Sequence, residues 1–255
     1  MSLKKNPIHG RQIRRFYERK WFTEFFASGP PIVAGAVGAL KAYEAAPTNT
    51  SWIWLSVGLA WLLVAQTTKV FLAYKQESRE DEQRSHDGLQ AALSVLHAVI
   101  TDALNKQGDD PPDLRATFHR VVPPIPDAKK LEQIIPYVGG ACDGENRQFP
   151  IHAGITGSAV RQNQVLIMDR LGQSEDAYRK ELIADWAYTE SDARKMTMDR
   201  FSAIALPVTD RTGKQVLGVI YMDAKRKNCF SSADVQNLIV AASGGITKYV
   251  GERYD

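Results

Sequence analysis

The chain has 255 residues, of which 44% are hydrophobic, and a formal net charge of +3. This length admits one domain of ordinary size and a smaller module. Cys142 and Cys229 form no CxxC pair and the five histidines are scattered, so no zinc spacing can be read, and the cysteine usage is typical of a reducing cytosol.

Residues 1–21 form a basic segment. Such a patch binds nucleic acid in some proteins, but beside an apolar segment it more often marks the cytoplasmic flank of a membrane span. We therefore expect a membrane, and no nucleic acid, as a partner. No apolar stretch with a small-residue cleavage site follows directly, so we expect no signal peptide. The basic residues are Lys4, Lys5, Arg11, Arg14, Arg15, Arg19 and Lys20.

The stretch from Trp52 to Ala73 is strongly apolar. It has about the twenty residues that cross a hydrocarbon core of roughly 30 Å. Its one full charge, Lys69, lies near the end, where a long side chain reaches the interface, and Trp52, Trp54 and Tyr74 suit aromatic belts. The length and the lack of a polar face argue against a buried helix of a soluble protein.

A weaker apolar segment, Phe22 to Ala46, comes before it and is interrupted by Gly29-Pro30-Pro31. We expect residues 22–74 to form two antiparallel transmembrane helices, with an interfacial or re-entrant first segment as the alternative. Basic residues flank the pair but are absent from the turn, which places both termini in the cytoplasm, at a bacterial inner membrane. Small residues that allow close helix approach are Ala34, Gly35, Gly38 and Ala39.

Residues 75–107 form the expected helical connector. Residues 75–84 are almost wholly charged or polar, and a heptad pattern of apolar residues follows. The pattern predicts a dimeric coiled coil or a single amphipathic helix that packs on its own domain, and one helix can do both. Residues 108–112 then end the helix. The heptad residues are Leu89, Leu93, Leu96, Ile100 and Ala103.

Residues 108–255 show a pattern of short strands and helices. The order of these elements predicts an α+β fold, with an antiparallel sheet, its first and last helices on one face, and a helical excursion, Ser174 to Met196, over the other. A sheet covered on both faces can enclose a pocket. The expected strands are Ala116–Val122, Leu131–Gly139, Val165–Met168, Phe201–Val208 and Val216–Ala224, and the closing helix is Ser232–Tyr249.

Three motifs stand in order in this region. They are Gly154-Ile155-Thr156-Gly157, the hairpin with Pro207-Val208, Gly213 and Gly218-Val219, and Phe230-Ser-Ser-Ala-Asp234 before the last helix. Together they make the sequence from about Gly88 to Arg253 resemble the GAF domain family. The resemblance implies a sensor domain that binds a small ligand, although some GAF domains bind nothing and only dimerise.

The resemblance leaves the ligand open. Cyclic-nucleotide GAF domains carry an N-K-(n)-F-x3-D-E signature, of which Lys225, Phe230 and Asp234 match three positions, while Ala224 and Val235 depart from it. A cyclic nucleotide would place its phosphate at the start of the helix that opens at Ile155, with Arg161 as a further cation, because helix N-termini favour anions. The candidate ligand-binding residues are Phe149, Ile155, Thr156, Gly157, Asp169, Arg170, Trp186, Tyr188 and Arg200.

Other chemistries have less support. A bilin usually needs a cysteine beside a histidine in the excursion, which has neither. Methionine-sulfoxide reductases of this fold use clustered cysteines, of which only Cys142 could lie near the pocket. We find no catalytic grouping, and we therefore expect no enzyme, no metal and no cofactor.

The sequence thus predicts a membrane-anchored cytosolic GAF sensor that signals through a dimeric or more highly oligomeric helix to its transmembrane hairpin. A sharper version is a nucleotide-gated effector of bacterial defence whose hairpins breach the membrane. The alternative is a ligand-free GAF dimer that acts as a scaffold for a partner protein.

Overall fold

The computed structural model describes residues 19–45, 49–108, 110–123, 127–140, 144–172 and 174–253. These residues belong to two compact units that divide between Gln83 and Arg84. Cys142 lies outside the described residues, and so does most of the basic segment.

The N-terminal unit contains helix α1 (Lys20–Ala45) and the first part of helix α2 (Asn49–Asn105). Both helices are long and apolar enough to cross a membrane. Two ion pairs join them, Lys69 to Glu24 at 3.1 Å and Lys20 to Glu80 at 2.7 Å.

Helix α1 continues through Gly29-Pro30-Pro31, where the apolar pattern of the sequence is interrupted. Apolar helices tolerate proline where neighbouring groups compensate for the lost backbone bonds. Gly35 lies against Leu62 of α2, with 3.6 Å between a Cβ built on the glycine and the leucine Cδ1, in agreement with the expected small-residue contact. The side chains of Trp52 and Trp54 lie outside the described part.

The second part of α2 includes the heptad residues, of which the first four lie in the interior of the domain, while Ala103 is only half-buried and the neighbouring Leu104 is buried in its place. Leu89, Leu93, Leu96, Ile100 and Leu104 are all buried in one core with the sheet and helix α6 (Ala233–Arg253). The amphipathic-helix alternative therefore describes this segment. The four buried residues of the seam are thus covered within one chain, and the predicted dimer stays a prediction.

The sheet is antiparallel and has six strands in the order β3-β2-β1-β6-β5-β4. The α+β architecture agrees with the sequence prediction, and β6 has the predicted bounds. Leu131–Gly139 was predicted too long, because the strand ends at Gln133, and β3 was missed because it pairs through only three residues at the sheet edge. The strands are β1 (Arg115–Val122), β2 (Lys130–Gln133), β3 (Gln148–Pro150), β4 (Leu166–Asp169), β5 (Ser202–Thr209) and β6 (Val216–Ala224).

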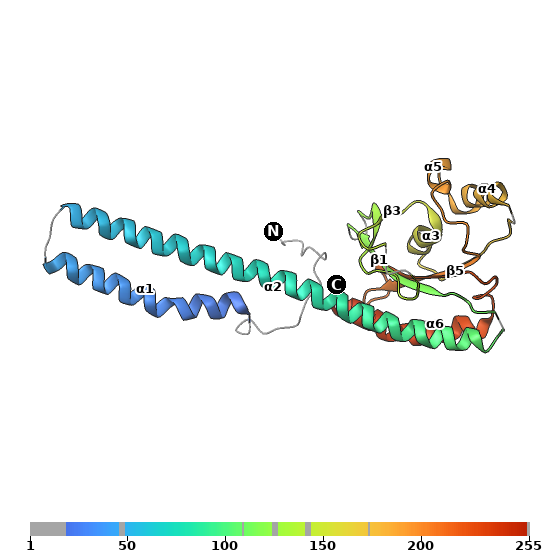
Figure 1. Cartoon of the computed structure of the whole chain (residues 1–255), viewed down its shortest axis with the longest axis horizontal. Helices are drawn as coiled ribbons and strands as arrows, with labels where there is room; N and C mark the ends of the chain where they lie inside the picture. The colour runs from blue at the N-terminus through green and yellow to red at the C-terminus, as the bar shows by residue number, and fades with distance from the viewer. Residues whose placement is uncertain are drawn as a thin grey trace. The chain divides into compact units, whose positions relative to one another are not determined.

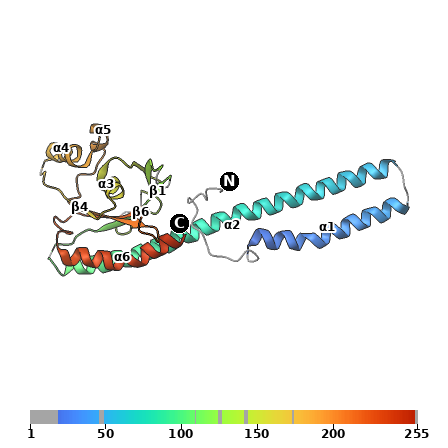
Figure 2. The ribbon, with the colours of Figure 1, turned by 180° about the vertical axis from the view of Figure 1, so that it is seen from behind.

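Helices cover both faces of this sheet (Figures 1 and 2). The last part of α2 and α6 lie together on one face, which we call the α2/α6 face. Three helices lie over the other, the α3 face: α3 (Gly154–Gln162), α4 (Glu175–Trp186) and α5 (Glu190–Ala193). Because side chains alternate along a strand, Phe118 of β1 faces α2 and α6 while Val121 faces α3.

Polar side chains cap the starts of the two helices in the Ser174–Met196 excursion. Ser174 accepts a hydrogen bond from the Ala177 amide at the start of α4, and Thr189 accepts one from the Asp192 amide at α5. Such side-chain caps satisfy amides that a helix leaves unpaired at its start. The Ser174–Met196 excursion is thus two helices with a tight corner at Ala187, which is left-handed.

Candidate functional site

The start of α3 is built from the Gly154-Ile155-Thr156-Gly157 motif. Gly154 has a φ of +77°, and a Cβ there would lie 2.6 Å from the Tyr188 hydroxyl. A Cβ on Gly157 would lie 2.4 Å from the Ile151 carbonyl oxygen. Both positions therefore need glycine, and the first of them brings Tyr188 against the start of the helix. Ala153 is the N-cap and provides no side-chain acceptor.

Several predicted site residues meet on the α3 face. Ile155 is buried there, and Phe149, Trp186 and Tyr188 pack around the same core while part of each remains exposed. Thr156 and Gly157 are buried in the same helix. Buried aromatic side chains with an accessible part are the usual lining of a small-ligand site. The structure thus brings together the aromatic and α3 members of the predicted set.

The predicted arginines of the site, Arg170 and Arg161, bind groups of the protein itself. Arg170 donates to the carbonyl oxygens of Gly172 and Met198, at 2.6 Å each, and its guanidinium lies 4.4 Å from the centre of the Tyr178 ring. It therefore fastens the loop before α4. Arg161 donates to the Ile151 carbonyl and to Ser158, which fastens the turn into α3.

Asp169 is turned away from the α3 face. It ends β4, next to Met168, which is part of the α3-face core, and strand alternation places it on the opposite side. Its Oδ2 accepts a hydrogen bond of 2.7 Å from Ser231, just before α6. Asp169 thus helps to hold the last helix.

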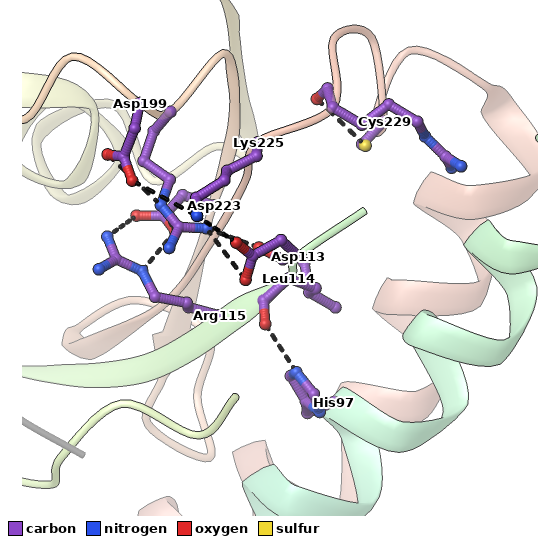
Figure 3. Close-up of polar contacts among 10 residues, drawn as sticks. His97, Asp113, Leu114, Arg115, Asp199, Asp223, Lys225 and Cys229 are labelled. Atoms are coloured by element: carbon purple, nitrogen blue, oxygen red, sulfur yellow. Dashed lines mark hydrogen bonds and ion pairs between the residues drawn. The ribbon is translucent and has the colours of Figure 1, made fainter. Parts of the chain in front are cut away.

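Arg200 belongs to a cluster of charged groups at one end of β1 and β6. Figure 3 shows Arg115, Asp223 and Asp113 of this cluster. Arg115 donates two hydrogen bonds to Asp223, at 2.9 and 2.8 Å, and Arg200 Nε lies 3.6 Å from the same carboxylate. Lys225 lies 2.6 Å from Asp113. Burial alone would lower the pKa of Arg115, but Asp223 raises it above its usual value. The hydrogen bond from Lys225 lowers the pKa of Asp113.

The C-terminal end of α2 is hydrogen-bonded to the same end of the sheet. Arg226 donates to the carbonyl oxygens of Leu104 and Asp110, each at 2.8 Å. The Lys225 amide donates to the Pro112 carbonyl at 3.0 Å, and His97 of α2 bonds to the Leu114 carbonyl at 2.9 Å (Figure 3). The residues after β6 therefore clamp the junction between α2 and β1.

Two residues of the partial cyclic-nucleotide signature, Lys225 and Phe230, make contacts within the domain. Lys225 pairs with Asp113, and Phe230 is buried in the core of the α2/α6 face. Neither residue lies with the aromatic groups of the α3 face. Cys229, next to Phe230 in the sequence, is buried.

Sequence reasoning missed His119. It lies in the middle of β1, on the α3 face, and only 3% of it is exposed. Its ring lies 5.0 Å from that of Phe149 and 5.7 Å from that of Tyr221. Burial lowers the pKa of His119 from 6.5 to about 3, so the ring is neutral at physiological pH. The signal available in the sequence was the alternation of Thr117, His119 and Val121 along one strand face.

The Tyr221 ring is stacked on this histidine. Burial raises the pKa of Tyr221 well above its usual value, and Asp223 and the phenol groups of Tyr137, Tyr178 and Tyr188 raise it further. The Tyr221 phenol is therefore neutral. In the part of the chain that the structure describes, no group of three or more His, Cys, Asp or Glu residues is placed to hold a metal ion.

Solved structures similar to this chain include GAF domains. The GAF domain region of a putative membrane protein from Geobacter sulfurreducens is 16% identical, with a TM-score of 0.39, over 64% of this chain and 97% of that one. The GAF domain of a two-component sensor histidine kinase from Bacillus halodurans is 15% identical, with a TM-score of 0.38, over 60% and 92%. No protein-family model and no curated protein matches the sequence. The C-terminal domain has an α+β fold, with its sheet covered by helices on both faces.

The comparisons also correct the prediction that the chain is not an enzyme. A type II free methionine-R-sulfoxide reductase from Thermoplasma acidophilum is similar, with 17% identity and a TM-score of 0.41 over 64% of this chain and 95% of that one. That prediction was wrong, because enzymes share this fold and the missing cysteine cluster rules out only one kind of chemistry. At this identity the likeness concerns the fold and assigns no activity.

Proposed function

We propose that the protein is a membrane-anchored sensor. Helix α1 and the first part of α2 cross the membrane, both termini lie in the cytoplasm, and the GAF-like domain binds a small molecule on its α3 face. Ligand binding changes the packing of the sheet against the last part of α2. The helix that then enters the membrane carries the signal.

One observation supports this proposal above the others: apolar side chains are exposed along the first part of α2 and buried along its second part. In the first part, Trp61 is 72% exposed, and Leu63 and Phe71 are similarly exposed. In the second part, Leu89 and Leu93 are fully buried. Exposed apolar surface of this extent indicates a lipid or protein environment, and α2 is long and apolar enough to include a span.

Membrane insertion is tested with the full-length protein expressed in a bacterium. The wild type should stay with membranes after an alkaline carbonate wash, and a Trp61→Arg/Val64→Arg variant should be released, because central arginines are costly in a bilayer. The matched control, Gln76→Arg/Gln83→Arg, changes the same helix beyond the apolar stretch and should stay. A freely soluble wild type would contradict the anchor.

Orientation is tested with fusions at the C-terminus. A green fluorescent protein fused after Asp255 should fluoresce, and alkaline phosphatase at the same place should be inactive, because both reporters would lie in the cytoplasm. The opposite pair of results would reverse the topology and place the domain outside.

Ligand binding is tested by thermal melts of the full-length protein in detergent. The probes are cyclic mononucleotides, nucleosides and free amino acids. A probe at a hundred times its dissociation constant stabilises the folded state by roughly 2.7 kcal/mol. A shift should be accompanied by altered hydrogen exchange in the last part of α2. Melts unchanged by every probe would favour the scaffold alternative.

A further inference from the structure

A cleft lies between α1 and the first part of α2, inside the N-terminal unit. Its volume is about 730 Å³, within the range of small-molecule sites. Among the described residues that line it, none is charged and most are apolar or aromatic, from Trp21 and Phe25 on α1 to Leu63, Phe71 and Tyr74 on α2. In the proposed membrane anchor, the occupant of this cleft comes from the lipid phase.

One polar side chain of this lining, Gln66, has unused hydrogen-bonding capacity. It is half-buried and lies about 12 Å along α2 from Tyr74, at a rise of about 1.5 Å per residue. Its amide has two N–H donors and one acceptor oxygen. The described residues give this amide one hydrogen bond, from Nε2 to the Glu24 carbonyl oxygen at 3.5 Å, which is long. A polar side chain in hydrocarbon is costly without partners, so Gln66 calls for an explanation.

Two other polar side chains near Gln66 are already paired. Thr67, which also lines the cleft, donates to the Leu63 carbonyl oxygen of its own helix at 2.8 Å. Lys69 is not part of the lining and pairs with Glu24 at 3.1 Å. The cleft therefore offers one neutral hydrogen-bonding group on an apolar and aromatic wall, which suits an uncharged ligand.

Two other occupants fit this lining less well. A helix of a second copy would occupy about 1,300 Å³ between Leu63 and Tyr74, taking a diameter of about 10 Å, and the cleft provides less. A phospholipid has its polar groups at the interface, so its acyl chains offer Gln66 only hydrocarbon. The ligand that fits is an apolar molecule with a polar group deeper in the bilayer. The aromatic wall at Phe25 and Phe71 suits a flat ring.

We propose that the cleft binds a membrane-dissolved ring compound with carbonyl groups, of the isoprenoid quinone class. The ring lies among Trp21, Phe25 and Phe71, one ring carbonyl accepts a hydrogen bond from Gln66 Nε2, and the apolar tail follows the cleft toward Ile32. This inference goes beyond the ligand site of the α3 face and rests on one part of the proposed function, the membrane anchor. The chain then has a ligand site in each of its two units.

The test uses full-length protein in phosphatidylcholine nanodiscs, with decylubiquinone as the probe, because quinones quench tryptophan fluorescence on contact. Quenching should saturate as the probe is added, and Trp21→Phe should remove the saturating part, since Trp21 lines the cleft. The matched control is Trp61→Phe, which should keep it, because Trp61 is 72% exposed and outside the lining. Quenching that rises linearly in all three proteins would mean free diffusion in the lipid and would overturn the site.

The role of the amide is tested with Gln66→Leu, which keeps the size of the side chain and removes the hydrogen bond. The dissociation constant of decylubiquinone should rise about tenfold. The matched control is Thr68→Val, because Thr68 lies outside the lining and bonds to the Val64 carbonyl oxygen of its own helix at 2.8 Å. This control should bind like the wild type. Equal affinity in wild type and Gln66→Leu overturns the role of Gln66.

A competition experiment needs no variant. Decylbenzene has a ring and a chain but no carbonyl group, so it should displace decylubiquinone from the wild type at least about tenfold less well than unlabelled quinone does. Equal displacement would mean that the cleft takes any apolar molecule, a lipid chain included. That result would overturn the quinone class even if Gln66→Leu does not insert into the nanodisc.

The outcomes separate this inference from the membrane anchor. A wild-type protein that withstands the carbonate wash but shows no saturating quenching leaves the anchor intact and overturns the quinone site. Release of the wild type by the wash overturns both.

Discussion

The two faces of the sheet contain different kinds of core. The α2/α6 face is filled with leucine, isoleucine and valine from α2, α6 and the strands. The α3 face contains small alanines from β5, aromatic rings that are only partly covered, and the buried polar groups His119 and Asp223. The first face thus resembles an ordinary core, and the second includes polar groups that lower the stability unless they have partners. The difference indicates that the α2/α6 face contributes more to the stability of the domain, and it fits the proposal that a ligand binds on the α3 face.

The strongest test of this comparison is at the apolar face. Leu96→Asp places a carboxylate in the filled core, and we expect it to destabilise the domain by at least about 4 kcal/mol, which unfolds it. The neighbouring Val95 is 67% exposed, and Val95→Asp should have little effect. Hydrogen exchange of the sheet amides in the full-length protein measures both. A folded Leu96→Asp variant would mean that α2 is not part of this core.

The second test is at the ionic cluster of the α3 face. Asp223→Ala removes a buried carboxylate and leaves the half-buried Arg115 without its partner, and the expected loss is about 3 kcal/mol, measured by the same exchange method. The exposed pair of Lys106 and Asp102 is the control, because Lys106→Ala should cost no more than about 1 kcal/mol. Equal effects of the two substitutions would show that the cluster is solvated.

The third test uses pH. His119 has a folded pKa of about 3 against an ordinary value of 6.5, so between these values the unfolded chain binds a proton that the folded chain does not. Stability should therefore fall as the pH is lowered through this window, by about 1.4 kcal/mol per pH unit. Urea unfolding between pH 6.5 and pH 5 should show this slope. His119→Phe should flatten it, and His152→Phe should leave it unchanged. An equal slope in all three proteins would rule out His119 as the cause.

The smallest expected effect concerns the junction with α2. Arg226→Gln removes a charge from the carbonyl end of the helix, and we expect a loss of about 1 kcal/mol. Faster hydrogen exchange at residues 100–107 would show it. Lys214, exposed in the β5–β6 turn, gives the control variant Lys214→Gln. Unchanged exchange in Arg226→Gln would mean that the other contacts of the junction suffice.

The regular parts of the domain could be predicted from sequence because their signals are local. The bounds of Val216–Ala224 follow from strand composition and a glycine turn, and the glycines of α3 follow from the motif. The partner of the heptad residues could not be predicted, because Leu96 is equally suited to a second helix and to its own sheet. The roles of Arg170 and Arg200 depend on carbonyls and carboxylates far away in sequence. His119 was missed because its strand position, rather than any motif, brings it beside Phe149 and Tyr221.

The clamp by Arg226 has an evolutionary consequence. A single side chain links the loop after β6 to the terminal carbonyls of the helix that leaves the domain. A single substitution at this position can therefore change how strongly the sheet is coupled to α2. The residues of the α3 face stay the same. If the chain is the proposed sensor, related proteins could in this way come to differ in the strength of the response while the ligand stays the same.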